Sequence, residues 1–272
     1  MSLQKASMNQ YSSKPKGNPA LMEDTYVLTS NYIAVFDGAT PKTVFRFPDG
    51  RTPGQIVAQT LADVVKKLPD DCTARRAADI MSDAVADALQ GHSGEASGVI
   101  FNRLRKEIWS IGDCQFALLN ADGSIERHHT EKLIDRQLSD WRASIVHSYL
   151  SRGLMSSDEI MADDPGRRII QPFITRQTIY QNRICELGFG VFDGRYIPDK
   201  FIEIYSVGSR VAAVILASDG YPILHRTLEE TEAALQQLLQ DDPLCIGALR
   251  GTKGIKQGHS AHDDRTYVKF SL

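Results

Sequence analysis

The order of strand-like and helical stretches is the feature that most restricts the fold of this chain. Two runs of β-branched and aromatic residues predict strands at 25–29 and 32–36, separated by a short polar turn that is typical of a hairpin. Apolar residues at helical spacing then predict two successive helices, over 54–68 and 74–90. The remaining expected elements are strands at 97–104, 106–111, 114–120 and 124–130, a helix at 131–152, strands at 184–192, 201–207 and 210–217, a helix at 227–240 and a strand at 265–272. Because strands and helices are grouped and do not strictly alternate, this order favours an α+β fold with antiparallel sheets covered by helix layers.

The sequence divides into a short N-terminal segment and one long domain. Residues 1–20 are small and polar, and we expect them to form a mobile N-terminal arm. Residues 21–272 contain no linker that divides them and no internal repeat, which indicates one domain. The segment 156–183 is mixed in pattern, with a turn predicted at Asp163-Asp164-Pro165-Gly166, and 247–262 reads as a loop.

The composition excludes several classes of protein. The formal net charge is −3, so nothing in the overall charge suggests nucleic acid or an anionic membrane as a partner. Four dispersed cysteines form no metal-binding or disulfide pattern, and reduced, buried thiols are expected. No stretch of 18 apolar residues and no secretory signal occur, so the expectation is a cytoplasmic protein.

Acidic residues stand at the ends of the predicted strands, where aspartate is otherwise disfavoured. One such residue alone is most simply a turn residue or a helix cap. The recurrence at several strand ends suggests that the carboxylates converge, where they would repel one another unless a hard divalent cation such as Mg²⁺ or Mn²⁺ bound them. The residues in question are Glu23 and Asp24 before the first strand, Asp37 after the second, Asp113 between two strands, Asp219 after a buried apolar run and Asp263 before the last strand.

Glycine follows two of these aspartates, in Asp37-Gly38 and Asp219-Gly220. Glycine permits a sharp turn and a close approach of the backbone, so the carbonyl oxygen of Gly38 could itself be a metal ligand. An ordinary Asp-Gly turn explains each pair equally well when it is taken alone.

Five short motifs, in this order, resemble the type 2C (PPM) family of metal-dependent Ser/Thr protein phosphatases, in a divergent bacterial-type branch. Their order and approximate separations match the family across nearly the whole chain. The A-S-D-G and D-D-x-T segments are the most specific. The motifs are M-E-D-T at 22–25, V-F-D-G-A-T at 35–40, S-I-G-D-C-Q at 110–115, V-I-L-A-S-D-G at 214–220 and D-D-R-T-Y-V at 263–268.

The resemblance implies an αββα sandwich, two antiparallel sheets flanked by helices, with a centre for two Mn²⁺ or Mg²⁺ ions. It implies hydrolysis of phosphomonoesters, as phosphoserine or phosphothreonine in proteins, by a hydroxide that bridges the ions; the targets of a cognate kinase are candidate substrates. The implied roles are Asp37 bridging both ions, Glu23 and the Gly38 carbonyl on one ion, Asp219 and Asp263 on the other, Asp24 orienting a water, and Asp113 holding a third ion found in some members.

The chain departs from the family pattern at the substrate-binding residues. Pro19 stands where the family often has an arginine for the substrate phosphate, and Lys14 or Lys16 could supply that charge or simply be solvated. The segment 186–194 does not match the family's central motif. No other substrate-binding residue is indicated.

Other interpretations remain open. The chain could be a catalytically inactive relative that binds a partner or a phosphorylated ligand. Another two-metal hydrolase such as a nuclease is disfavoured by the acidic pI of about 6.2. His259 or His262 could act as a general acid, or be a loop residue without a role. The run Gly188-Phe189-Gly190 lacks the spacing of a nucleotide-binding loop.

Overall fold

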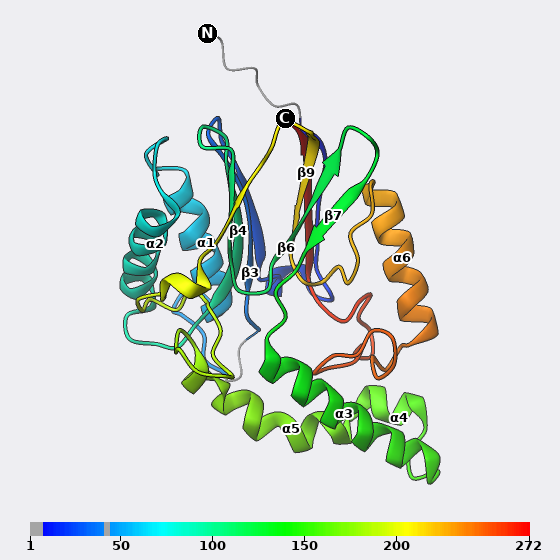
Figure 1. The fold of residues 1–272 in the computed structure, drawn as a ribbon. Helices are drawn as coiled ribbons and strands as arrows, with labels where there is room; N and C mark the ends of the chain where they lie inside the picture. Colours follow the sequence, from blue (N-terminus) through cyan, green and yellow to red (C-terminus); the bar gives the residue numbers. More distant parts are fainter. Residues whose placement is uncertain (1–7, 41–43) are drawn as a thin grey trace.

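The computed structural model of the protein describes residues 8–40 and 44–272, which form two five-stranded sheets (Figure 1). The first sheet has the order β1 (Met8–Lys14), β10 (Arg265–Ser271), β9 (Val211–Ala217), β6 (Gln115–Asn120) and β7 (Ile125–His128). The second sheet has the order β2 (Asp24–Leu28), β3 (Tyr32–Gly38), β4 (Ala96–Asn102), β5 (Glu107–Ile111) and β8 (Glu203–Ser206). All of these neighbouring strands are antiparallel, and the predicted α+β sandwich is confirmed.

Helices cover the outer faces and one end of the sandwich. In Figure 1, α1 and α2 lie outside the second sheet, α6 lies outside the first, and α3, α4 and α5 lie below the strand ends. The α-helices are α1 (Pro53–Val65), α2 (Ala74–Leu89), α3 (Leu133–Ser151), α4 (Ser157–Ala162), α5 (Pro165–Arg176) and α6 (Leu228–Asp241), and the short 3-10 helices are η1 (Pro19–Leu21), η2 (Gln177–Tyr180) and η3 (Asp199–Phe201). In the described part of the chain, no helix is both long and apolar enough to cross a bilayer.

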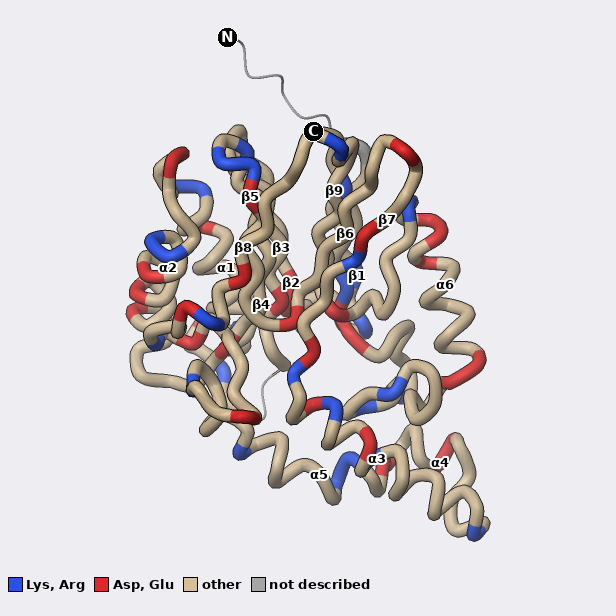
Figure 2. The backbone as a smooth tube through the Cα atoms, viewed as in Figure 1, with Lys and Arg blue, Asp and Glu red and all other residues tan. Residues whose placement is uncertain are grey.

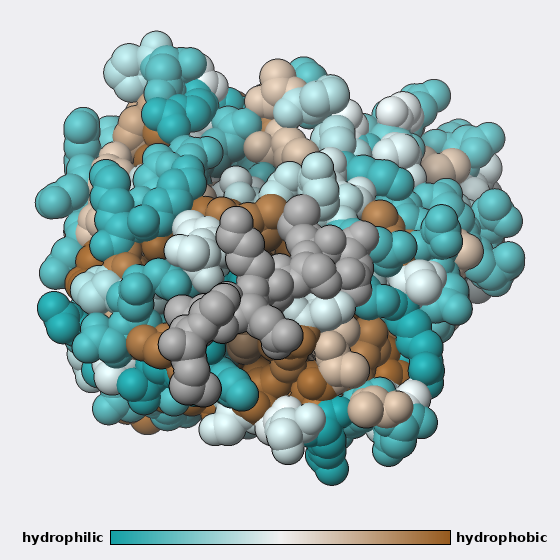
Figure 3. Space-filling view, turned by 90° about the horizontal axis from the view of Figure 1, so that it is seen from above, coloured by the Kyte–Doolittle hydropathy of each residue, from teal (hydrophilic) through white to brown (hydrophobic). Residues whose placement is uncertain are grey.

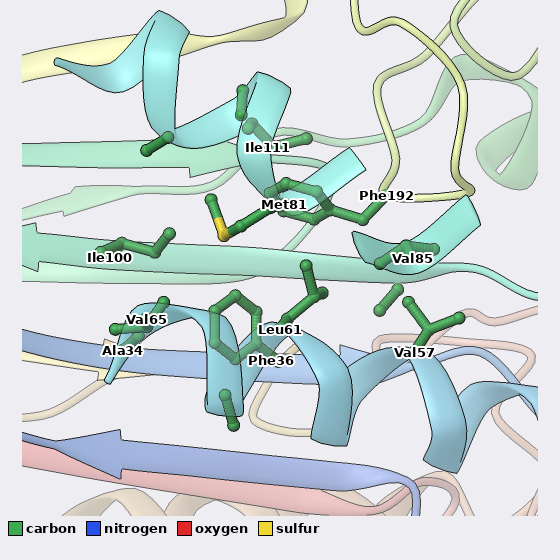
Figure 4. Packing of buried hydrophobic residues seen from close by; sticks show 14 of the residues in the cluster. Ala34, Phe36, Val57, Leu61, Val65, Met81, Val85, Ile100, Ile111 and Phe192 are labelled. Carbon is green, nitrogen blue, oxygen red and sulfur yellow. The ribbon is translucent and has the colours of Figure 1, made fainter. Parts of the chain in front are cut away.

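The hydrophobic core has three main layers. Between the sheets, Val35 and Phe101 of the second sheet pack with Phe116 and Leu216 of the first. Outside the second sheet, apolar side chains of α1 and α2 cover β3 and β4, as Figure 4 shows for Leu61 and Met81. A third layer joins α6 to the outer face of the first sheet. Burial on both faces explains why β9 reads as a continuous apolar run.

The predicted mobile arm over residues 1–20 is wrong for much of its length. Residues Met8–Lys14 form β1, which pairs with β10 as far as Lys14 and Arg265. Residues 1–7 lie outside the described residues. Because the partner strand comes from the far end of the chain, local composition gave no sign of this pairing.

Two local predictions are also corrected. Residues 184–192 form turns and isolated bridges instead of a strand, and the Asn182 side chain both donates to the backbone of Val191 and accepts from it. The glycines at 188 and 190 weaken strand propensity there. The segment predicted as a turn at Asp163-Asp164-Pro165-Gly166 is instead the start of a helix. The Asp164 side chain caps α5, whose first residue is Pro165.

Candidate active site

Strand pairing brings the acidic strand ends together at one end of the sandwich, the lower end in Figure 1. In the second sheet, Asp24 of β2 lies opposite Asp37 of β3. In the first sheet, β9 pairs with β10, so Asp219 follows one strand close to where Asp263 precedes the other. Asp113 lies in the link between β5 and β6, where the chain passes from one sheet to the other. The opposite end of the sandwich, seen in Figure 3, has a largely hydrophilic rim.

The glycines after two of these aspartates are required by close backbone approach. A Cβ at Gly38 would collide with the carbonyl oxygen of Gly54, at the start of α1. A Cβ at Gly220 would collide with the carbonyl oxygen of Asp264. A side chain at either position would therefore push apart the segments that carry the acids.

Three of the carboxyl groups lie next to one another, with Asp24 buried and Asp37 and Asp219 partly buried. Burial, together with the charges of Asp24, Asp219 and Asp263, raises the pKa of Asp37 well above its ordinary value. Burial likewise raises the pKa of Asp219 to about 7, with Asp113 and Asp263 adding repulsion, and the pKa of Asp24 to about 8. Asp37 and Asp219 share a side-chain hydrogen bond. Negative charge at this point is thus poorly compensated by the protein itself.

Asp263 has cationic partners on both carboxylate oxygens. The Lys16 ammonium lies 2.9 Å from Oδ1, and the Lys253 ammonium lies 2.5 Å from Oδ2. Lys16 also donates to the hydroxyl of Thr40 at 2.9 Å. Burial alone would raise the pKa of Asp263, but the charges of Lys253 and Lys16 hold it well below its ordinary value.

Asp113 also has an ammonium partner. Lys132, at the start of α3, places Nζ 2.8 Å from Asp113 Oδ2, and the Ser97 hydroxyl donates to Oδ1. Burial would raise the pKa of Asp113, but Lys132 and these hydrogen bonds lower it below its ordinary value.

Glu23 is held by the segment that begins α1. The Thr52 hydroxyl donates to Glu23 Oε1 at 2.5 Å, while the Thr52 side chain also caps α1. The Asp264 carboxylate accepts the backbone N–H groups of Lys16 at 2.8 Å and Glu23 at 3.1 Å. Asp264 therefore fixes the segment that carries both Lys16 and Glu23.

A pocket of about 430 Å³ lies over this end of the sandwich. Acidic and basic positions meet between the strand ends and α3 in Figure 2. Five of the predicted site residues line the pocket: Asp37, Gly38, Asp113, Asp219 and Asp263. Its basic lining consists of Lys16, Lys132, Arg142, Arg167, Lys253 and Lys256. Glu23 and Asp24 are buried and are not part of this described lining.

The donor chemistry fits a divalent cation at part of this cluster. Among the described residues, no three His, Cys, Asp or Glu side chains stand in an arrangement ready to hold an ion. Asp37 and Asp219 are nevertheless partly buried oxygen donors whose raised pKa a hard cation would lower, and Asp24 Oδ1 is buried without a hydrogen-bond partner in the described part of the chain. Asp113 and Asp263, by contrast, already carry ammonium partners.

Sequence reasoning missed most of the residues that support this cluster. Lys132 and Lys253 are isolated basic residues with no motif around them, and Thr52 reads only as a helix cap. Asp264 had a signal, since it adjoins Asp263 in the D-D-R-T motif. Of the two weighed lysines, Lys16 lines the pocket, while Lys14 forms an ion pair with Glu232 of α6 at 3.1 Å.

The two pocket histidines are poor candidates for a charged general acid. Burial lowers the pKa of His262 to about 4 and also lowers the pKa of His259. Both imidazoles are therefore neutral near pH 7. A neutral imidazole is a much weaker proton donor than an imidazolium.

Comparison with known proteins identifies the fold. No family model and no curated protein sequence matches the chain. A bacterial serine phosphatase structure superposes with a TM-score of 0.52 at 14% identity, covering 97% of this chain and 96% of that chain. The serine/threonine phosphatase Stp1 from Staphylococcus aureus gives a TM-score of 0.52 at 12% identity, covering 100% of this chain and 98% of that chain. The chain therefore has the fold of bacterial serine phosphatases, a sandwich of two antiparallel sheets with flanking helices.

Proposed function

We propose that this chain is a metal-dependent phosphatase that hydrolyses phosphomonoesters, with phosphoserine or phosphothreonine of proteins as its substrates. The observation that carries the proposal is a cluster of partly buried, poorly compensated carboxylates at a lysine-lined pocket, at the strand ends of a phosphatase fold. Clustered carboxylates destabilise a protein unless a cation binds them, and lysines on a pocket wall favour an anionic ligand.

The proposed cation is Mn²⁺ or Mg²⁺, because carboxylate and carbonyl oxygens suit hard cations. When bound, such ions would activate a water and neutralise the charge of the phosphoryl group. Asp37 and Asp219 are the central proposed ligands. The further proposed ligands are Asp263, Glu23 and the Gly38 carbonyl oxygen.

Other residues of the pocket would bind the substrate phosphate and orient the water. Lys16 and Lys253 lie on the pocket lining, and their ammonium groups can bind phosphate oxygens as they now bind Asp263. In this proposal Lys16 supplies the charge that Pro19 cannot. Asp24 accepts the Ser218 hydroxyl on Oδ2 at 2.6 Å, which leaves Oδ1 available to orient a water.

The test is hydrolysis of p-nitrophenyl phosphate and of a phosphothreonine peptide with Mn²⁺, with Mg²⁺ and with EDTA. We expect turnover that requires the metal and is lost in Asp219→Ala. Asp63→Ala is the matched control, because Asp63 is an exposed acid that pairs only with its helix neighbours Lys66 and Gln59 in the described structure. Turnover that persists in EDTA, or in Asp219→Ala, would contradict the proposal.

A second candidate function is an inactive relative that binds a phosphorylated ligand. Two observations favour it. Pro19 stands in the place of the family's arginine, and Lys16 and Lys253 already form ion pairs with Asp263, a proposed metal ligand. Calorimetric titration with Mn²⁺ separates the two candidates when no turnover is seen. Metal binding without turnover of either substrate supports the binder, and no metal binding at all rules out Asp37 and Asp219 as ligands.

A further inference from the structure

Lys132 forms an enclosed ion pair with Asp113 at this end of the molecule. Its ammonium lies 2.8 Å from Asp113 Oδ2, and the two side chains are only 13% and 16% exposed. The same ammonium lies 5.2 Å from the centre of the Phe189 ring, a cation–π distance. Residue 132 is the N-cap of α3, so its backbone position is fixed by a long helix. These contacts hold the cation in one place.

The other oxygen of Asp113 is also occupied. The Ser97 hydroxyl donates to Oδ1, and the backbone N–H of Asp113 returns a hydrogen bond to Ser97 Oγ at 3.3 Å. Both oxygens of the carboxylate therefore have donors from the chain itself. A cation entering here would have to displace a buried ammonium or sit against it, and like charges at that distance repel strongly.

The carboxylates of the cluster differ in this respect. Asp37 and Asp219 form no ion pair among the described residues, whereas Asp113 is paired with a lysine held by a helix and a ring. Asp263 is paired too, but its lysines come from the segment after β1 and from the 247–262 loop, and no helix start or aromatic ring holds their ammonium groups among the described contacts.

We propose that Lys132 is a built-in cation that takes the place of a third divalent ion on Asp113, so that the centre binds metal only through its remaining acids. This inference rests on the proposed function for the metal ions themselves. It predicts that Asp113 does not bind metal in this protein. The ammonium then provides fixed positive charge at the edge of the pocket, whatever the concentration of metal.

The experiment counts the Mn²⁺ ions bound per chain by equilibrium dialysis with elemental analysis. We expect wild type and Asp113→Asn to bind the same number of ions. Lys132→Met should bind one ion more than wild type, because it frees the Asp113 carboxylate, and the double variant should return to the wild-type number. Lys132→Arg, which keeps the charge, and Lys66→Met, which removes an exposed ion pair, should both match wild type.

Fewer ions on Asp113→Asn than on wild type would overturn the inference, as would a Lys132→Met variant that gains no ion. Should Lys132→Met fail to fold, Lys132→Gln replaces it. The ion counts of wild type and Asp113→Asn still decide whether Asp113 binds a metal ion. Ion counts as expected, with no phosphatase turnover in any metal, would leave this inference standing and remove the proposed function.

Discussion

Replacing Asp219 by asparagine should stabilise the metal-free protein, although the residue lies at the centre of the proposed site. The pKa of Asp219 is raised from 3.8 to about 7, chiefly by burial. At about 1.4 kcal/mol for each unit of pKa, this difference corresponds to a penalty of about 4 kcal/mol when the group is ionised. Asparagine keeps the shape of the side chain and removes the charge that burial opposes.

The sign of the pH dependence follows from the same shift. Between about pH 4 and pH 7 the folded protein keeps a proton on Asp219 that the unfolded chain has released, so stability falls as pH rises through this window. The variant should therefore gain about 2 kcal/mol over wild type at pH 5 and about 4 kcal/mol at pH 8. Urea unfolding in EDTA at both pH values measures this difference in the free energy of unfolding.

Asp113→Asn is the matched control, because it removes a carboxylate that Lys132 already compensates. It should destabilise the protein at pH 8, since it leaves a buried ammonium without its partner. If Asp219→Asn were no more stable than wild type at pH 8 in EDTA, the argument that the cluster is poorly compensated would be refuted.

Three other substitutions test separate parts of the structure. Lys253→Met should tighten Mn²⁺ binding in calorimetry, because it removes an ammonium that competes with the metal for Asp263; unchanged or weaker binding would show that Asp263 is not a ligand. Arg142→Met should lower the free energy of unfolding by about 3–5 kcal/mol, because this fully buried guanidinium donates to three carbonyl oxygens and to Asp164, whereas Arg250→Met, at an exposed ion pair, should change it by less than about 1 kcal/mol. Phe36→Ala should cost about 3–5 kcal/mol in urea unfolding, and a loss below about 1 kcal/mol would contradict the packing of α1 on β3.

The fold was largely predictable because its elements carry strong local signals. The helices α1 and α2 show apolar residues at helical spacing, and the strands β2, β3 and β9 show runs of β-branched, aromatic or other apolar residues. β1 was missed because its hydrogen bonds come from β10 at the other end of the chain. The strand predicted at 184–192 is wrong because apolar residues alone do not distinguish a partly buried loop from a strand.

The acidic half of the site was predictable and the basic half was not. The acids follow or precede recognisable strands, so convergence of strand ends could be anticipated for Asp37 and Asp219, although they belong to different sheets. Lys132 and Lys253 lie at a helix start and in a loop, and only the tertiary structure brings them to the carboxylates. A lone lysine in a sequence is usually a solvated surface residue. No sequence pattern therefore distinguishes the few lysines that form ion pairs in a pocket.

The pairing of β1 with β10 has a consequence for synthesis on the ribosome. The segment carrying Lys16 leaves the ribosome well before its partner strand and Asp263. The second sheet with α1 and α2 can collapse early, since most of its strands are close in sequence. The acidic cluster of the nascent chain therefore stays incomplete until β10 has left the ribosome, and the metal affinity that we propose would develop only after that step.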